Sequence, residues 1–164
     1  MKNMTRMILV AILALPLLAA CAKEEAPKVE AQAAMSAPAG DDLDAWRAYL
    51  QDVVPRNMGG IANQPYVYLL PGESAPDFQD QYDRMLEKAQ SDVGRGIISG
   101  NMLAYASPAS AKMADIVVAS FASVPPGSMK GVRVLFIGQP ADGDRVKAAV
   151  EPAGVNYVFV DSTK

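Results

Sequence analysis

The sequence contains no histidine and a single cysteine, and these absences exclude most familiar kinds of catalytic and metal-binding site. Without histidine, neither Ser-His-Asp nor Cys-His catalysis is possible, nor is the usual zinc site of histidine and cysteine ligands. One cysteine cannot form a CxxC redox pair. An enzyme would have to rely on carboxylates, lysine, tyrosine or a Ser-Lys pair, so the sequence favours a protein without catalytic activity.

Basic clusters and cofactor motifs are also missing. The chain has 15 basic and 18 acidic residues, and the basic ones are scattered, which argues against nucleic-acid binding. The glycines of Gly138–Gly143 lack the GxGxxG spacing of a dinucleotide site. The acidic run from Asp41 to Asp44 lacks the glycine and closing glutamate of a calcium loop. No cofactor is therefore expected.

The N-terminus has the outline of a signal peptide. Lys2 and Arg6 precede an apolar run from Met7 to Ala20, which at 14 residues is shorter than the roughly 20 needed to cross a bilayer. The run ends in Leu18-Ala19-Ala20-Cys21, with small residues before the only cysteine. This stretch resembles the lipobox of bacterial lipoproteins.

The resemblance implies a modification, a cleavage point and a location. In that class the cysteine sulfur receives a diacylglyceryl group, the signal is removed before it, and the new N-terminus is acylated, so Cys21 would be the lipidated residue. Ala22 follows instead of the aspartate that retains many Gram-negative lipoproteins in the inner membrane, which favours the outer membrane. The alternative is a plain secretory signal followed by a free cysteine.

Three regions are expected: a cleaved signal (1–20), a lipidated cysteine with a disordered tether (21–40), and one folded domain (41–164). Residues 22–40 are rich in alanine, proline and charge and offer little to bury. Without Lys2 and Arg6 the chain has 13 basic and 18 acidic side chains, a net charge of −5. This net charge argues against electrostatic docking on anionic lipid, so the acyl chains would supply the attachment.

The domain shows helical and strand patterns in alternation. An amphipathic helix with Trp46 and Tyr49 on its apolar face comes first, capped by the aspartates at 41–44. Short apolar runs then alternate with helical segments, which predicts βαβ units. The expected strands are 66–70, 102–106, 132–137 and 155–160, and the expected helices follow at about 78–93, 107–124 and 144–150.

These patterns predict an α/β fold: a three-layer open sheet of about four mainly parallel strands with helices on both faces, preceded by an N-terminal helix. A thioredoxin-like mixed sheet with an antiparallel edge is the alternative. The order of the strands does not follow from the sequence.

Polar residues after the expected strands are the candidate ligand site, because open α/β sheets bind ligands beyond the carboxyl ends of their strands. The candidates are Ser74, Ser107, Ser110, Asp142 and Asp144. Serine and aspartate before a helix are also typical N-caps, and we favour that structural interpretation. Asp142 and Asp144, joined by Asp161, are the alternative as ligands of a divalent cation.

Three functions remain open. The favoured one is a lipid-anchored envelope protein whose domain is a non-enzymatic binding or assembly module for a periplasmic protein partner. The second is a lipoprotein that binds a small ligand or divalent cation in the strand-end crevice. The third is an enzyme that uses carboxylate or Ser-Lys chemistry.

Overall fold

The computed structural model describes residues 33–164, and its first regular element is helix α1 (Leu43–Arg56). The Asp42 carboxylate accepts the backbone N–H groups of Asp44 and Ala45 at 2.9 and 3.4 Å, which confirms the predicted acidic cap. Trp46 and Tyr49, at 2 % exposure each, lie on the buried face of α1. They are core residues, as the sequence indicates.

Four strands form one parallel sheet, in the order of the chain: β1 (Tyr66–Leu69), β2 (Met102–Ala106), β3 (Arg133–Gly138) and β4 (Asn156–Asp161). Every neighbouring pair is parallel. The predicted parallel sheet is confirmed, and each strand bound lies within one residue of the expected one. Within residues 33–164 no antiparallel edge strand supports the thioredoxin-like alternative.

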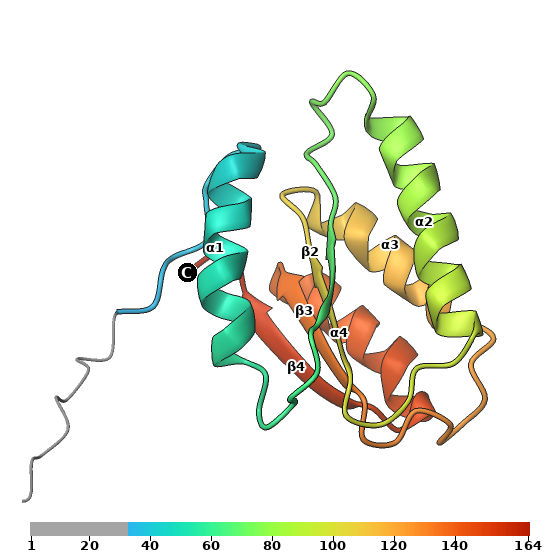
Figure 1. Cartoon of the computed structure of the whole chain (residues 1–164). Coiled ribbons are helices and arrows are strands. Elements are labelled where there is room, and N and C mark those ends of the chain that lie inside the picture. Colours follow the sequence, from blue (N-terminus) through green and yellow to red (C-terminus); the bar gives the residue numbers. More distant parts are fainter. Residues whose placement is uncertain (1–32) are drawn as a thin grey trace, which may run out of the picture. The chain divides into compact units, whose positions relative to one another are not determined.

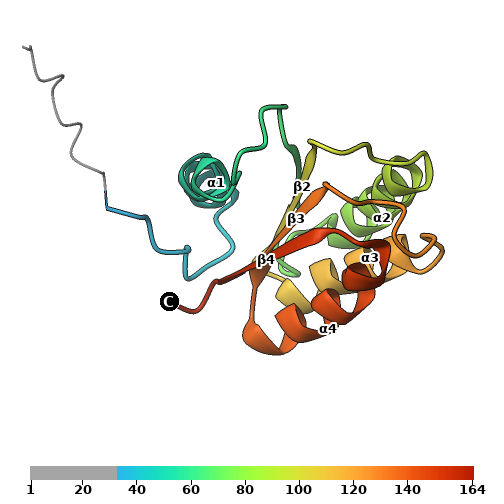
Figure 2. The same ribbon diagram turned by 90° about the horizontal axis from the view of Figure 1, so that it is seen from below.

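Helices cover both faces of this sheet. Each of α2 (Phe78–Gly94), α3 (Ser110–Phe121) and α4 (Pro140–Val150) connects one strand to its neighbour, and all three lie on the same face (Figures 1 and 2). A short 3₁₀ helix, η1 (Glu151–Ala153), follows α4. Helix α1 covers the opposite face, so the three predicted layers are present. Helix α3 packs against both α2 and α4, which explains why it is apolar around most of its circumference.

A row of aromatic side chains crosses the sheet under the three helices. Tyr68, Tyr105, Phe136 and Phe159 occupy the same register position on the four strands. The rings of Tyr68 and Tyr105 are stacked with centroids 4.7 Å apart, and those of Phe136 and Phe159 with centroids 6.4 Å apart. This row forms the centre of the larger core.

The segment before α1 contacts the domain. Residues 33–40 run beside α1, where Gly40 accepts the Trp46 Nε1–H at 2.8 Å and Met35 donates its N–H to Asp52 at 3.0 Å. Ala37 packs against the core under α1. This part of the expected tether therefore lies along the helix, while Cys21, the signal and residues 22–32 lie outside the described residues. Among the described helices, none combines the length and apolar character needed to cross a membrane.

Candidate functional site

The strand order bears directly on the predicted ligand crevice. Crevices of open α/β sheets form where the strand order reverses and successive crossover helices go to opposite faces. Here the order is β1-β2-β3-β4, with α2, α3 and α4 on one face, so the described sheet contains no such reversal. The carboxyl ends of the strands still meet at one edge, and the five predicted residues follow them.

Ser110 and Asp142 meet in a buried network between α3 and α4. Ser110 Oγ donates to Asp142 Oδ2 at 2.7 Å and accepts the Gln139 N–H at 2.9 Å. The other oxygen of Asp142 accepts from Arg145 Nε at 3.1 Å. The Arg145 guanidinium also donates to Asp115 and to the Ala111 carbonyl, both at 2.6 Å. These bonds join the two helices.

The other three predicted residues have separate partners. Ser107 Oγ accepts the Ala109 N–H at 2.8 Å and donates to the Pro71 carbonyl at 3.4 Å. Ser74 Oγ donates to Asp41 at 2.6 Å in an exposed pair. Asp144 is exposed and lines a shallow hollow beside η1. Of the five, only Ser110 and Asp142 share a hydrogen bond in the described part of the chain.

The predicted N-cap role is wrong for Asp142. Ser107 is not the N-cap residue of α3 either, although it binds a backbone amide just before that helix. Asp142 is the third residue of α4, and its carboxylate accepts from Ser110 and Arg145. Gln139 is the N-cap residue of α4, and its side chain makes no capping hydrogen bond. The backbone N–H of Gln139 donates instead to Ser110 on the neighbouring helix. Ser107 binds an amide just before α3, and the N-cap Ala109 offers no side-chain bond.

A buried carboxylate on α2 is a feature that the sequence analysis missed. Asp92, 6 % exposed, accepts from the Tyr68 hydroxyl at 2.7 Å, from Lys88 Nζ at 2.5 Å and from the Arg95 guanidinium. Burial by itself raises the pKa of Asp92, but the bonds from Lys88, Tyr68 and Arg95 outweigh it and lower the pKa below its usual range. Lys88 and Arg95 stand four residues before and three residues after Asp92. On a helix these spacings place the charges side by side, so the sequence does carry a signal for this cluster.

Tyr105 lies beside this cluster without a hydrogen-bond partner among the described residues. Its side chain is fully buried, and burial raises the pKa of its hydroxyl well above the usual value. Burial, and then the bond to Asp92, also raise the pKa of Tyr68. Both oxygens of Asp92 are occupied by donors, so we interpret the cluster as a structural ion pair that fixes α2 on the sheet.

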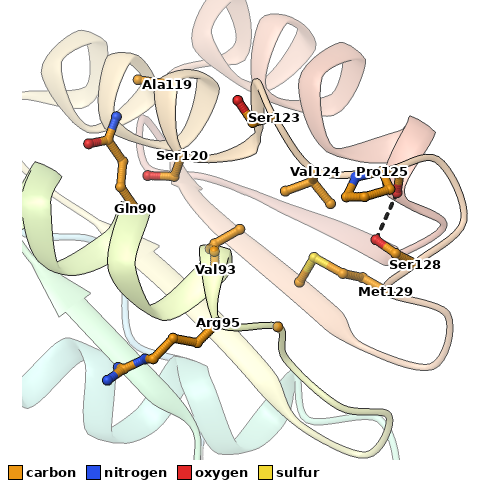
Figure 3. Close-up of a pocket in the computed structure, with 12 residues that line it drawn as sticks. Gln90, Val93, Arg95, Ala119, Ser120, Ser123, Val124, Pro125, Ser128 and Met129 are labelled. Carbon is orange, nitrogen blue, oxygen red and sulfur yellow. Dashed lines mark hydrogen bonds between the residues drawn. The ribbon is translucent and has the colours of Figure 1, made fainter.

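One cavity lies where α2 and α3 finish, at the end of the helices opposite to the Ser110–Asp142 network. Its volume is about 420 Å³, and neutral polar side chains face apolar ones in it (Figure 3). Arg95 contributes to the wall, but its guanidinium points away from the other labelled side chains and pairs with Asp92. The remaining side chains that line this α2–α3 cavity are Gln90, Val93, Ala119, Ser120, Ser123, Val124, Pro125, Ser128 and Met129.

A further hollow is a groove between α1 and β1. The groove exists because α1 covers the central strands and leaves the first strand partly exposed. Its volume is about 510 Å³. Val67 is 47 % exposed and Tyr66 is 41 % exposed. The residues that line this α1–β1 groove are Arg47, Leu50, Gln51, Val54, Pro55, Met58, Gln64, Pro65, Val67 and Leu69.

The described residues contain no group of three or more acidic or cysteine side chains arranged to hold a metal ion. No protein-family model, curated protein or solved structure matches the chain.

Proposed function

We propose that this chain is a lipid-anchored bacterial envelope protein, whose domain is a non-enzymatic binding or assembly module for a periplasmic protein partner. The lipobox-like stretch ending at Cys21 supports the anchor, and Ala22 favours the outer membrane. The observation that carries the binding role is the α1–β1 groove beside an edge strand.

The edge of β1 offers backbone groups for pairing. Leu70 donates its N–H to the Ala106 carbonyl at 3.1 Å, toward β2. Because backbone groups alternate along a strand, those of Val67 and Leu69 point to the outer side, where the described sheet has no further strand. An extended segment of a partner can add there as a fifth strand.

The groove beside this edge suits apolar side chains of such a segment. Its lining is mostly aliphatic, and its one charged member, Arg47, is held by Asp44 at 2.6 Å. Filling it therefore removes apolar surface from water at little cost in broken ion pairs. Backbone pairing and apolar contact would act together on one extended peptide segment.

Val67→Pro tests this binding mode. Proline removes an N–H that the β1–β2 ladder does not use, so the domain should keep its thermal midpoint within a few degrees while strand addition is blocked. We expect partner capture by the mature lipidated protein to fall at least about tenfold, a loss on the order of one or two hydrogen bonds. The control Val67→Thr keeps the N–H and the branched side chain. Equal capture by folded Val67→Pro would contradict the proposal.

A second candidate function, small-ligand binding, rests on the α2–α3 cavity. Its volume of about 420 Å³ suits a small ligand, and Gln90, Ser123 and Ser128 offer neutral polar groups. A thermal-shift screen with sugars and amino acids separates the two functions. A ligand that raises the midpoint of the wild type, but not of a cavity-filling Ala119→Phe variant, would favour this second candidate.

A further inference from the structure

We propose that the end of the domain where the strands begin docks on the membrane that holds the lipid anchor, through anionic headgroups. This inference rests on the lipid anchoring proposed above. The surface consists of three loops, 57–65, 95–101 and 122–132, together with Arg56 and Arg133 beside them; we call it the amino-end surface. These loops gather at the bottom of Figure 1.

The loops of this surface are joined to one another. Gly100 donates its N–H to the Gly131 carbonyl at 2.9 Å, and Asn63 Nδ2 donates to Asn101 Oδ1 at 3.4 Å. A Cβ at Gly59 would collide with the Arg133 guanidinium, which shows how closely that side chain crosses the first loop. The amino-end surface is therefore continuous.

An apolar side chain projects from the middle loop. Ile98 is 74 % exposed, while the preceding Ile97 is 9 % exposed and belongs to the core. The flanking Gly96 and Gly100 have φ of +87° and +85°, so the loop turns sharply on both sides of the isoleucine pair. A single exposed isoleucine is ordinary, but one on the same loop as Arg95, within a surface that also carries Lys130 and Arg133, has the character of a membrane-interface contact.

Charge is distributed unevenly between the two ends of the domain. The amino-end surface carries Arg56, Arg95, Lys130 and Arg133, and the acidic groups beside it are Asp52, the buried Asp92, which is held by Lys88 and Arg95, and Glu151 on η1. Arg56 is paired with Asp52 on its own helix. The opposite end carries the exposed acidic residues Asp41, Asp42, Asp44, Glu73, Asp77, Asp80 and Asp144.

This separation changes the electrostatic argument. A net charge of −5 disfavours contact with anionic lipid only if the charge is spread evenly over the molecule. Because headgroup attraction acts within a Debye length, roughly 8 Å at physiological salt, the end that touches the membrane decides the sign. The basic end is attracted, and the acidic end is kept away from the surface.

The path of the chain favours the same orientation. Met35 binds Asp52 in the C-terminal half of α1, so the chain enters the domain closer to the amino-end surface than to the N-terminus of that helix. From Cys21 to Ala33, at about 3.5 Å per residue, the chain spans at most roughly 42 Å. The domain itself is roughly 36 Å across. The anchor therefore keeps the domain within about one diameter of the membrane.

A fluorescence-quenching experiment on the mature lipidated protein tests this docking. Since Cys21 would be blocked by its lipid, Ala62→Cys in the first amino-end loop provides one free thiol for a fluorophore, and Glu73→Cys provides the matched position at the opposite end. The protein is placed in vesicles of phosphatidylethanolamine and phosphatidylglycerol that contain a headgroup quencher. We expect stronger quenching of the label at position 62 than at position 73.

Substitutions in the surface then identify the forces. We define the orientational preference as the ratio of quenching at position 62 to quenching at position 73. The double variant Ile98→Asp with Lys130→Glu should reduce this preference by about fivefold, the effect of removing one basic charge from the surface. Lys112→Glu, the same charge reversal near the opposite end, should leave the preference unchanged. Phosphatidylcholine vesicles should reduce it as well, because they lack the anionic headgroup.

The outcomes separate this inference from the proposed function. Equal quenching at positions 62 and 73 in the wild type, or an unchanged preference in the double variant, would overturn membrane docking while leaving the anchor intact. Protein that fails to sediment with any vesicle would overturn the lipid anchor itself, and the inference with it.

Discussion

At the residue scale, the described core places a satisfied polar cluster beside a polar group that has no partner. Asp92 receives three donors, so its buried charge is compensated. The Tyr105 hydroxyl, on a ring stacked 4.7 Å from that of Tyr68, has none among the described residues. An unsatisfied buried hydroxyl costs about 1–3 kcal/mol, so the two tyrosines should respond in opposite ways to the same change.

We predict that Tyr105→Phe leaves the free energy of unfolding unchanged or raises it by up to about 1 kcal/mol, because it removes a hydroxyl without a partner. Tyr68→Phe should lower it by about 2 kcal/mol, because Asp92 loses a donor. Urea denaturation of both variants measures the difference. A Tyr105→Phe protein that is the less stable of the two would show that this hydroxyl has a partner, such as a buried water.

At the scale of elements, two glycines allow a close approach, one between the end of β3 and α3 and the other between α4 and β4. A Cβ at Gly138 would lie 2.5 Å from Ser110 Oγ, and one at Gly143 would lie 2.7 Å from the ring of Phe159. Tyr157 adds a bond from its hydroxyl to the Gly143 carbonyl at 2.9 Å. The end of β3 is thus fitted closely to α3, and the start of α4 is fitted closely to the edge strand β4.

The Ser110 network tests whether burial decides how much a serine–aspartate hydrogen bond contributes to stability. We predict that Ser110→Ala lowers the free energy of unfolding by about 2 kcal/mol, because Gln139 and Asp142 both lose a buried partner. Ser74→Ala removes a serine–aspartate bond of similar length that is exposed, and should cost less than about 0.5 kcal/mol. Equal effects in thermal or chemical denaturation would contradict a structural role for the buried network.

At the scale of the whole molecule, the proposed anchor and the two described cores lie in different parts of the chain. The two cores are built from residues 37–160, and the expected lipidation site lies outside the described residues. Three acyl chains on one cysteine would hold a protein stably on a membrane, whereas one chain gives only marginal binding.

We predict that Cys21→Ala abolishes membrane association and leaves the thermal midpoint of the domain unchanged, because the described cores are built from residues 37–160. Metabolic labelling with a fatty-acid analogue, followed by membrane fractionation, measures the first effect. Wild-type protein that takes up no label would contradict the lipoprotein assignment.

The sequence predicts those features that depend on local pattern. The continuous apolar run Val134–Ile137 and the all-round apolar α3 indicate buried strands and a central helix, and both are confirmed. The strand order depends on which face each crossover takes, and no local pattern encodes that choice. The Ser110–Asp142 pair is 32 residues apart in the chain, so the sequence offers capping as the simpler explanation for both.

The consecutive strand order also has a consequence for how the domain would form during the export proposed above. A chain that crosses a membrane from its N-terminus emerges one βαβ unit at a time, so each new strand of this sheet would find its neighbour already outside. The sheet can therefore grow by addition at one edge, with short loops to close, which favours fast folding and short exposure of unpaired strands. Helix α1 would be the exception: it would emerge first, yet its core partners extend from Met102 on β2 to Ile137 on β3. Its docking would be complete only after β3 has joined the sheet.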